Sequence, residues 1–192
     1  MATIRPEDAA NILIMLYRQT NYRCDYRKLQ KLVIYADIIY YQKTKKRMIE
    51  SDCVTATQNG LSIEKLCTGT YQMSFNTIDE RAEIVETIDK TLELPLNSLY
   101  DYKRDVVNDD QKDILCYVFK KLGAYSGDDL TSISTHTELW KKARNMAESP
   151  EQIIKVTNSM YNDFIEFVIE KMENNNDSFQ TFFINFLLSL LQ

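Results

Sequence analysis

The sequence predicts a mainly α-helical fold: a compact helical domain with a minor short β-hairpin or small sheet, followed by a C-terminal helical tail. Three observations predict it. The 192 residues include only four glycines and three prolines, so residues that interrupt helices are scarce. Apolar residues make up 44% of the chain, which is enough for one sizeable core. Several stretches place apolar residues at helical spacing and begin at residues that cap helices.

The first two helices are well marked. Pro6 suits the first turn of a helix, and apolar residues follow it at helical spacing as far as Tyr17. Asp25 is placed to cap the next helix, which we expect from Tyr26 to about Thr44. This second helix is apolar nearly all round, so it should be central and buried.

The middle of the chain carries a turn and little else that is clear. Asn59-Gly60 is a strong turn sequence, and Ser62 is placed to cap a short helix after it. Further on, residues 73–75 and 91–94 alternate between apolar and polar, which favours short half-buried strands.

Helical signals return at Asn108, which can cap a helix that ends at Gly123. Ser126 is expected to begin another helix, with Asp129 three residues later in the capping-box position. A third helix is expected to begin at Ser149-Pro150, because proline is favoured at the first helical position.

The end of the chain is unusually apolar. Residues 174–177 interrupt the helical pattern, and residues 179–191 are too few to cross a bilayer but too apolar to face water. We therefore expect a domain of residues 1–173 and an appended helical segment of residues 174–192. The segment docks on the domain, forms a homodimer contact through residues 179–191, or contacts a partner.

The residues available for chemistry are few. His136 is the only histidine, which excludes a multi-histidine metal site, and the four cysteines form no C-x-x-C pair, so we expect free buried thiols. Neither a glycine-rich phosphate loop nor a Gly-x-Ser-x-Gly elbow occurs. His136 precedes Glu138 by two residues and could serve as a general base, but a structural or partner-binding role is favoured. Trp140 shares a helix face with His136 if that turn is helical, and is either a core anchor or an interface residue. We expect no catalytic residue, cofactor or metal.

Charge argues against a nucleic-acid partner. The net charge is −5, whereas nucleic-acid-binding domains are normally basic. Tyrosines between residues 22 and 41 do interleave with basic residues, but their helical spacing assigns most of them to the core. The basic run of residues 43–47 is either a solvated loop beside a helix C-terminus or a contact site for an anion.

The N-terminus lacks the apolar core of a signal peptide, and no stretch reaches 18 uninterrupted apolar residues. We therefore expect a cytoplasmic protein with no membrane partner.

Three segments resemble the Panacea domain of the SocA-like antitoxin family, which also includes phage- and mobile-element-associated proteins. The family's KLQKLLYYA helix corresponds to KLQKLVIYA at residues 28–36, and its glycine turn corresponds to Gly60, although Leu61 stands where the family has proline. Its third pattern, with Tyr-Ser, Thr-His and Trp, corresponds to residues 122–140. The three segments occur in the family's order.

The resemblance implies a mostly helical, non-enzymatic antitoxin that neutralises a toxin by direct protein contact. Two alternatives remain open: an adaptor that delivers a toxin to a ClpXP-type protease, and a phage or mobile-element inhibitor of a host protein. The positions carried over from the family as candidate partner-binding residues are Lys31, Gly60, Tyr125, Ser126, His136 and Trp140.

Overall fold

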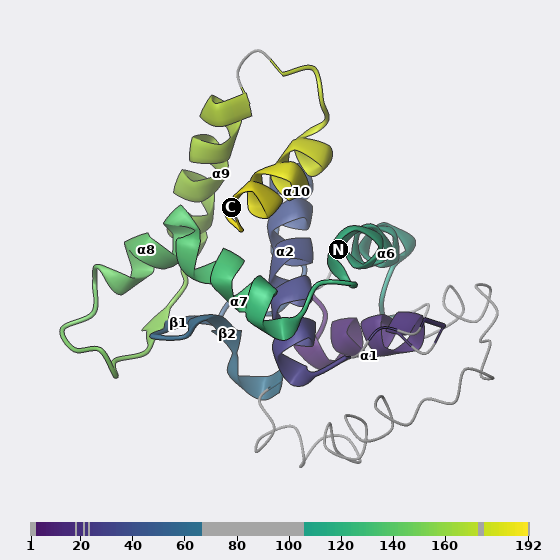
Figure 1. Ribbon diagram of the computed structural model, residues 1–192, viewed down its shortest axis with the longest axis horizontal. Helices are drawn as coiled ribbons and strands as arrows, with labels where there is room; N and C mark the ends of the chain where they lie inside the picture. The colour runs from purple at the N-terminus through teal and green to yellow at the C-terminus, as the bar shows by residue number, and fades with distance from the viewer. Residues whose placement is uncertain are drawn as a thin grey trace.

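The computed structural model describes residues 3–17, 19–20, 22, 24–66, 106–172 and 175–191. Within these ranges the protein is mainly α-helical with one small antiparallel sheet, as the sequence predicts. Helix α2 stands at the centre, with α1 and α6 on one side of it and α8 and α9 on the other (Figure 1). The strands expected at residues 73–75 and 91–94 lie outside the described residues.

Helices α1 (Pro6–Tyr17) and α2 (Tyr26–Thr44) have the bounds that the sequence predicts. The side chain of Asp25 accepts from the backbone N–H of Lys28 at 2.9 Å, which caps α2 at its first turn. The residues from Lys28 to Tyr41 are all buried, and most of them are apolar or aromatic. The central position of α2 therefore follows from its composition.

The sheet is small and has the order β2-β1-β3. Strand β1 (Val54–Thr57) pairs antiparallel with β2 (Gly60–Ile63) through a two-residue turn at residues 58–59, one position earlier than the predicted Asn59-Gly60, and β3 (Ile154–Lys155) pairs with the other side of β1. The expectation that Ser62 caps a helix is wrong. Ser62 lies inside β2 opposite Thr55, and the helical turn η1 begins only at Glu64 and ends at Leu66.

Two of the three predicted C-terminal helix starts are confirmed. Asn108 and Ser126 cap α6 (Asp109–Leu122) and α7 (Gly127–His136), both with complete capping boxes. The short α8 (Glu138–Arg144) follows α7 after a single residue, Thr137. Helices α6 and α7 and strand β2 pack against α2, whereas α8 packs against α7, α9 and the sheet.

The prediction that a helix begins at Ser149-Pro150 is wrong, because this helix begins later. Residues 149–152 form a turn whose carbonyl oxygens at Ser149, Pro150 and Gln152 accept from the guanidinium of Arg144. Strand β3 follows, and helix α9 (Asn158–Met172) begins only after it. Four of the five residues from Ile153 to Thr157 are β-branched, which favours the extended backbone that pairs with β1.

Helix α10 (Phe179–Ser189) packs onto the domain through one apolar face. Phe183 is fully buried and its ring meets the rings of Tyr35, Phe164 and Phe179 at centroid distances of 6.4, 6.2 and 5.7 Å. Within the described residues no helix combines the length and the apolarity needed to cross a membrane.

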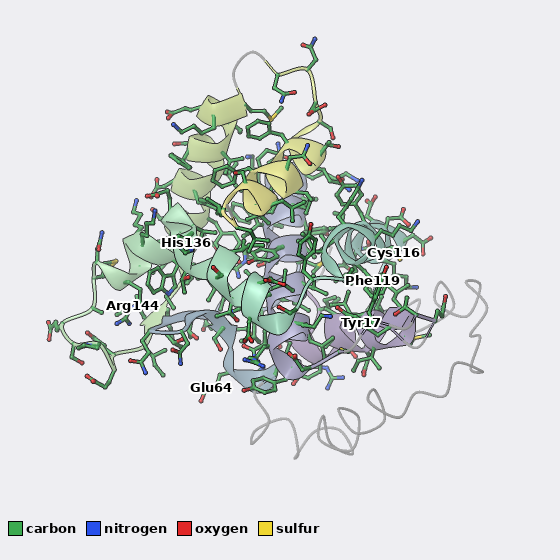
Figure 2. All side chains as sticks on the ribbon, in the orientation of Figure 1. Tyr17, Glu64, Cys116, Phe119, His136 and Arg144 are labelled. Carbon is green, nitrogen blue, oxygen red and sulfur yellow. The ribbon has the colours of Figure 1, made fainter. Side chains whose placement is uncertain are left out.

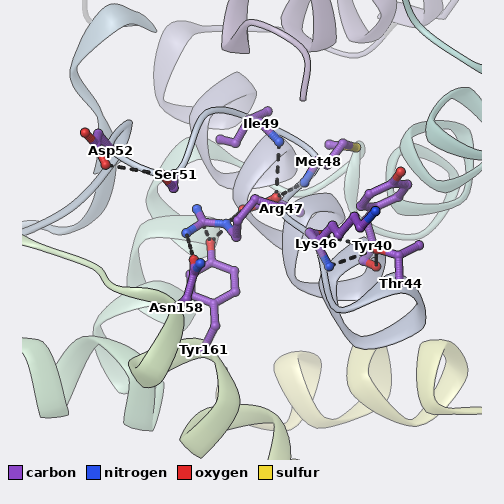
Figure 3. A network of polar contacts seen from close by, with 11 residues as sticks. Tyr40, Thr44, Lys46, Arg47, Met48, Ile49, Ser51, Asp52, Asn158 and Tyr161 are labelled. Atoms are coloured by element: carbon purple, nitrogen blue, oxygen red, sulfur yellow. Dashed lines mark hydrogen bonds and ion pairs between the residues drawn. The ribbon is translucent and has the colours of Figure 1, made fainter. Parts of the chain in front are cut away.

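A polar network lies inside the core, between α2, the segment after it and α9 (Figure 3). The carboxylate of Asp37 accepts from Nε of Arg47 at 2.6 Å, from the hydroxyl of Tyr161 at 3.0 Å and from the backbone N–H of Met48 at 2.6 Å. Arg47 also lies over the ring of Tyr161, 3.9 Å from its centroid. The basic run at residues 43–47 thus ends in a buried cation, which neither of its two interpretations anticipated.

Candidate functional site

The tip of the β1–β2 hairpin is held by side chains from three helices. Gly60 directly follows the turn, as the first residue of β2, and has φ of +110°, a conformation that side-chain-bearing residues rarely adopt. A Cβ atom at this position would lie 2.9 Å from Oγ of Ser134 on α7 and 3.1 Å from Nζ of Lys31 on α2. Glycine is therefore required both by the backbone angle and by the close approach of two helices.

Both backbone groups of Leu61, its N–H and its carbonyl, are hydrogen-bonded to side chains from helices. The N–H of Leu61 donates to Oγ of Ser134 at 2.7 Å, and the carbonyl of Leu61 accepts from the ammonium of Lys31. Proline, which the family pattern has at this position, carries no N–H. Leu61, in place of that proline, therefore supplies the N–H that donates a hydrogen bond to Oγ of Ser134.

The rest of the outer side of β2 is bonded to Gln30 of α2. Its side-chain oxygen accepts from the backbone N–H of Ile63 at 3.0 Å and from the hydroxyl of Ser62 at 2.8 Å. Gln30 and Lys31 are adjacent residues on α2 and are both buried. The start of α2 thus fixes the position of β2 along its whole length.

Strand β1 is held from the other end of the turn. The indole Nε1 of Trp140 donates to the carbonyl oxygen of Thr57 at 2.8 Å. Trp140 itself is half-buried and packs against the core. It is therefore a core anchor that also fixes the hairpin.

A pocket of about 560 Å³ opens between the first turns of α2, the hairpin tip and α7. We call it the α2–hairpin pocket. It is lined by two cations, several hydroxyl and amide groups and a tyrosine: Tyr26, Arg27, Gln30, Lys31, Thr57, Gln58, Asn59, Ser62, Thr131 and Thr135.

The six candidate residues contribute in different ways. Lys31 lines the pocket, whereas Gly60 and Trp140 position the hairpin that forms one of its walls. Ser126 caps the start of α7 and is exposed, and Tyr125 before it is half-buried. The structure thus brings Lys31, Gly60 and Trp140 together around the hairpin, and places the other residues along α7.

His136 is exposed at the end of α7 that adjoins α8 (Figure 2). Its Nδ1 lies 2.7 Å from the backbone oxygen of Ser132, one helical turn earlier. Thr137 ends α7 and its side chain caps α8, so His136 and Trp140 lie on two different helices. The shared helix face that continuous helical spacing implies is therefore absent.

Arg27, Gln30 and Ser134 belong to this site, although the sequence alone did not single them out for it. Gln30 and Arg27 do carry a signal, because polar residues on a nearly all-apolar helix need a partner or a solvent-facing position. Ser134 carries none, since its bond to Leu61 joins residues 73 positions apart.

A second, larger pocket of about 820 Å³ lies beside the segment that follows α2. Its charges are mixed: Lys65 pairs with Glu50 at 2.5 Å, and this hydrogen bond lowers the pKa of Glu50. The thiol of Cys53 donates to Glu50 at 3.4 Å, and burial raises the pKa of Cys53 to about 12. Cys53 is therefore a protonated thiol at neutral pH and a poor nucleophile.

In the part of the chain that the structure describes, no group of three or more histidine, cysteine, aspartate or glutamate side chains could hold a metal ion. Cys24 and Cys53 are buried free thiols, as expected, but Cys116 is only partly buried. Cys67 lies outside the described residues.

Comparison with known proteins assigns the chain to a family. Neither a curated protein nor a solved structure gives a significant match. A family model described as "Antitoxin SocA-like, Panacea domain" matches residues 29–141, which is more than half of the chain. The matched range contains the helix of Lys31, the Gly60 turn and the segment that ends at Trp140. The chain therefore belongs to the SocA-like antitoxin family and carries its Panacea domain.

Proposed function

We propose that this protein is an antitoxin that neutralises a toxin protein by direct binding in the cytoplasm, without catalysing a reaction. One observation carries the proposal. The three sequence segments that resemble the family are 28–36, the Gly60 turn and 122–140, and they meet at the hairpin through the bonds of Lys31, Ser134 and Trp140. The family description supports a protein partner.

The hairpin tip is suited to recognition because it is held rigidly. Its backbone is bonded by side chains from α2, α7 and α8, so little conformational freedom is lost when a partner binds. We propose that the binding surface comprises the hairpin tip, the start of α2 and the exposed side of α7. Such a surface can cover a toxin's active or target-binding region, for which an interface of about 1,600 Å² in total is typical.

The proposal is tested by co-expression with any small reading frame found next to the gene. We expect that frame alone to arrest growth and the pair to grow and to co-purify as a complex. Gly60→Ala should weaken rescue because it displaces the hairpin, whereas Lys120→Ala, at an exposed position of α6, should leave rescue unchanged. A toxic neighbour that is neither rescued nor bound would overturn the proposal.

Two other outcomes identify the alternatives. Rescue that requires a ClpXP-type protease, with faster loss of the toxin, would indicate a proteolytic adaptor. Binding to a host protein, with activity in the absence of any toxin, would indicate an inhibitor of a host factor.

A further inference from the structure

We infer that the α2–hairpin pocket binds a carboxylate, presented by an aspartate or glutamate side chain of the partner protein. The inference rests on the proposed function, because it names the chemistry by which that partner is recognised. It starts from the lining of the pocket. Arg27 and Lys31 are its charged residues, and no described residue that lines it is acidic. The charges on the lining itself are therefore both positive, although the chain has a net charge of −5.

Lys31 supplies a fixed charge on the inner wall. Its side chain is buried, with 5% of its surface exposed, and its ammonium is positioned by the carbonyl of Leu61. A charge held away from bulk water acts more strongly on an incoming anion than the same charge on the surface. The position is set by the hairpin itself, so a partner that recognises the cation also recognises the folded turn.

Arg27 supplies a second cation at the mouth of the pocket. Its guanidinium Nη1 lies 2.7 Å from Oδ1 of Asp128 on α7, and both side chains are exposed, by 48% and 83%. An exposed pair of this kind is weak, and a guanidinium binds a carboxylate through two parallel hydrogen bonds. Asp128 therefore occupies the position relative to Arg27 that an acidic side chain of the partner can take.

The surroundings favour a single carboxylate over a phosphate-rich ligand. Asp128, which pairs with Arg27, and Asp129 lie in the first turn of α7, and Asp25 lies at the start of α2, where its carboxylate would be 3.0 Å from a Cβ on Gly127. These three acidic side chains repel every anion, but they repel a polyphosphate or a nucleic-acid backbone more strongly than a single carboxylate, because the repulsion grows with the charge of the ligand. A single carboxylate on a protein loop is therefore the anion that this lining favours.

The two members of the exposed pair give opposite predictions. Arg27→Gln removes an attractive charge, and Asp128→Asn removes an internal competitor. We expect Arg27→Gln to weaken binding of the partner about tenfold, the loss typical of one charged hydrogen bond. We expect Asp128→Asn to strengthen it several-fold. If the pair were only structural, both variants would act in the same direction.

A matched control is present at the other end of the same helix. Lys43 of α2 pairs with Asp110 of α6 at 2.9 Å, and both of these side chains are exposed as well. Lys43→Gln and Asp110→Asn change the net charge as the test variants do, but far along α2 from the pocket. They should leave binding unchanged. Thermal unfolding of all four variants checks that each retains its fold.

A second measurement does not need the partner. Capped glutamate, capped glutamine and inorganic phosphate are titrated into the full chain, and nuclear magnetic resonance follows the side-chain amides of Gln58 and Asn59. Fluorescence of Trp140, the only tryptophan, reports on the adjoining Thr57. We expect glutamate to give saturable shifts that need about tenfold more ligand in Arg27→Gln, and glutamine to give none.

Three results would overturn the inference: equal shifts with glutamate and glutamine, shifts that saturate at the same glutamate concentration in Arg27→Gln, or tighter binding of phosphate than of glutamate. These results leave the proposed function intact if the protein still rescues growth. Conversely, a chain that neutralises no toxin but binds glutamate through Arg27 would retain the pocket's chemistry and lose the proposed function.

Discussion

Nε of Arg47 lies 2.6 Å from Oδ2 of Asp37, and both side chains are almost completely buried. The pair joins α2 to the segment that follows it, and Tyr161 extends the contact to α9. The hairpin that we propose as the binding surface begins only a few residues later, at Val54. The core network therefore sets where β1 starts relative to α2.

Removing one member of this pair should be costly. Arg47→Met leaves the Asp37 carboxylate buried without its cation, and we expect the free energy of unfolding to fall by about 3–5 kcal/mol. The exposed Lys43–Asp110 pair provides the comparison, since Lys43→Met should cost less than about 1 kcal/mol. Urea unfolding measures both. Equal losses in the two variants would contradict the role of the buried pair.

The turn at Gly60 should tolerate no side chain. Gly60→Ala forces a strained backbone angle and brings a methyl group against Ser134, so we expect a loss of about 1–3 kcal/mol. Ser134→Ala should cost a similar amount because the N–H of Leu61 loses its acceptor. In the double variant the clash with Oγ is gone, so the two losses should sum to less than expected for independent sites. Strict additivity would argue against direct contact.

Helix α10 should contribute strongly to stability through one residue. Phe183→Ala empties a site between Tyr35 and Phe164, and we expect a loss of about 3–5 kcal/mol. Phe182→Ala, at the half-buried neighbouring position, should cost clearly less. Equal effects would show that α10 does not dock in this orientation.

The separate question of a homodimer through residues 179–191 is answered by deletion of residues 177–192. Light scattering compares the mass of the deleted and complete chains. A change from two chains per particle to one after deletion would support a dimer contact, and an unchanged oligomeric state with lower solubility would support docking on the domain. An unchanged oligomeric state together with unchanged solubility would contradict both predictions.

Glu50 should make a small contribution to the way the free energy of unfolding decreases at acidic pH. Its pKa is lowered by the hydrogen bond from Lys65, so the ionised form is favoured in the folded protein. A carboxyl group of this kind stabilises the fold above its ordinary pKa, and the contribution disappears as pH falls through the lowered value. Lys65→Met should return the pKa of Glu50 toward its ordinary value, measured from the side-chain carboxyl resonance. An unchanged titration would contradict the contribution of Lys65.

Much of the fold could be predicted because its signals are local. The caps at Asp25, Asn108 and Ser126 are read from neighbouring residues, and each begins a helix where expected. The predicted start of α9 is wrong because residues 154–155 pair with β1, which lies about a hundred residues earlier in the chain. This pairing outweighs the good capping sequence at Ser149-Pro150. A local pattern could not weigh that pairing, although the β-branched run at residues 153–157 indicated it.

The candidate site could be predicted in part. Lys31, Gly60 and Trp140 came from the family resemblance, and they do meet at the hairpin. The other polar groups at the hairpin could not be found in this way, because the bonds of Ser134 and Gln30 depend on the packing of α7 and α2 against β2. Arg27 gains its proposed role only through the pocket that this packing forms.

The bonding of β2 also affects how the protein behaves at high concentration. Strands at the edge of a sheet offer unpaired backbone groups to strands of other molecules, which leads to aggregation or exchange of segments. Here the outward N–H groups of Leu61 and Ile63 are already occupied by Ser134 and Gln30, and the outward carbonyl of Leu61 by Lys31. The same side chains that position the hairpin tip therefore prevent β2 from adding a further strand.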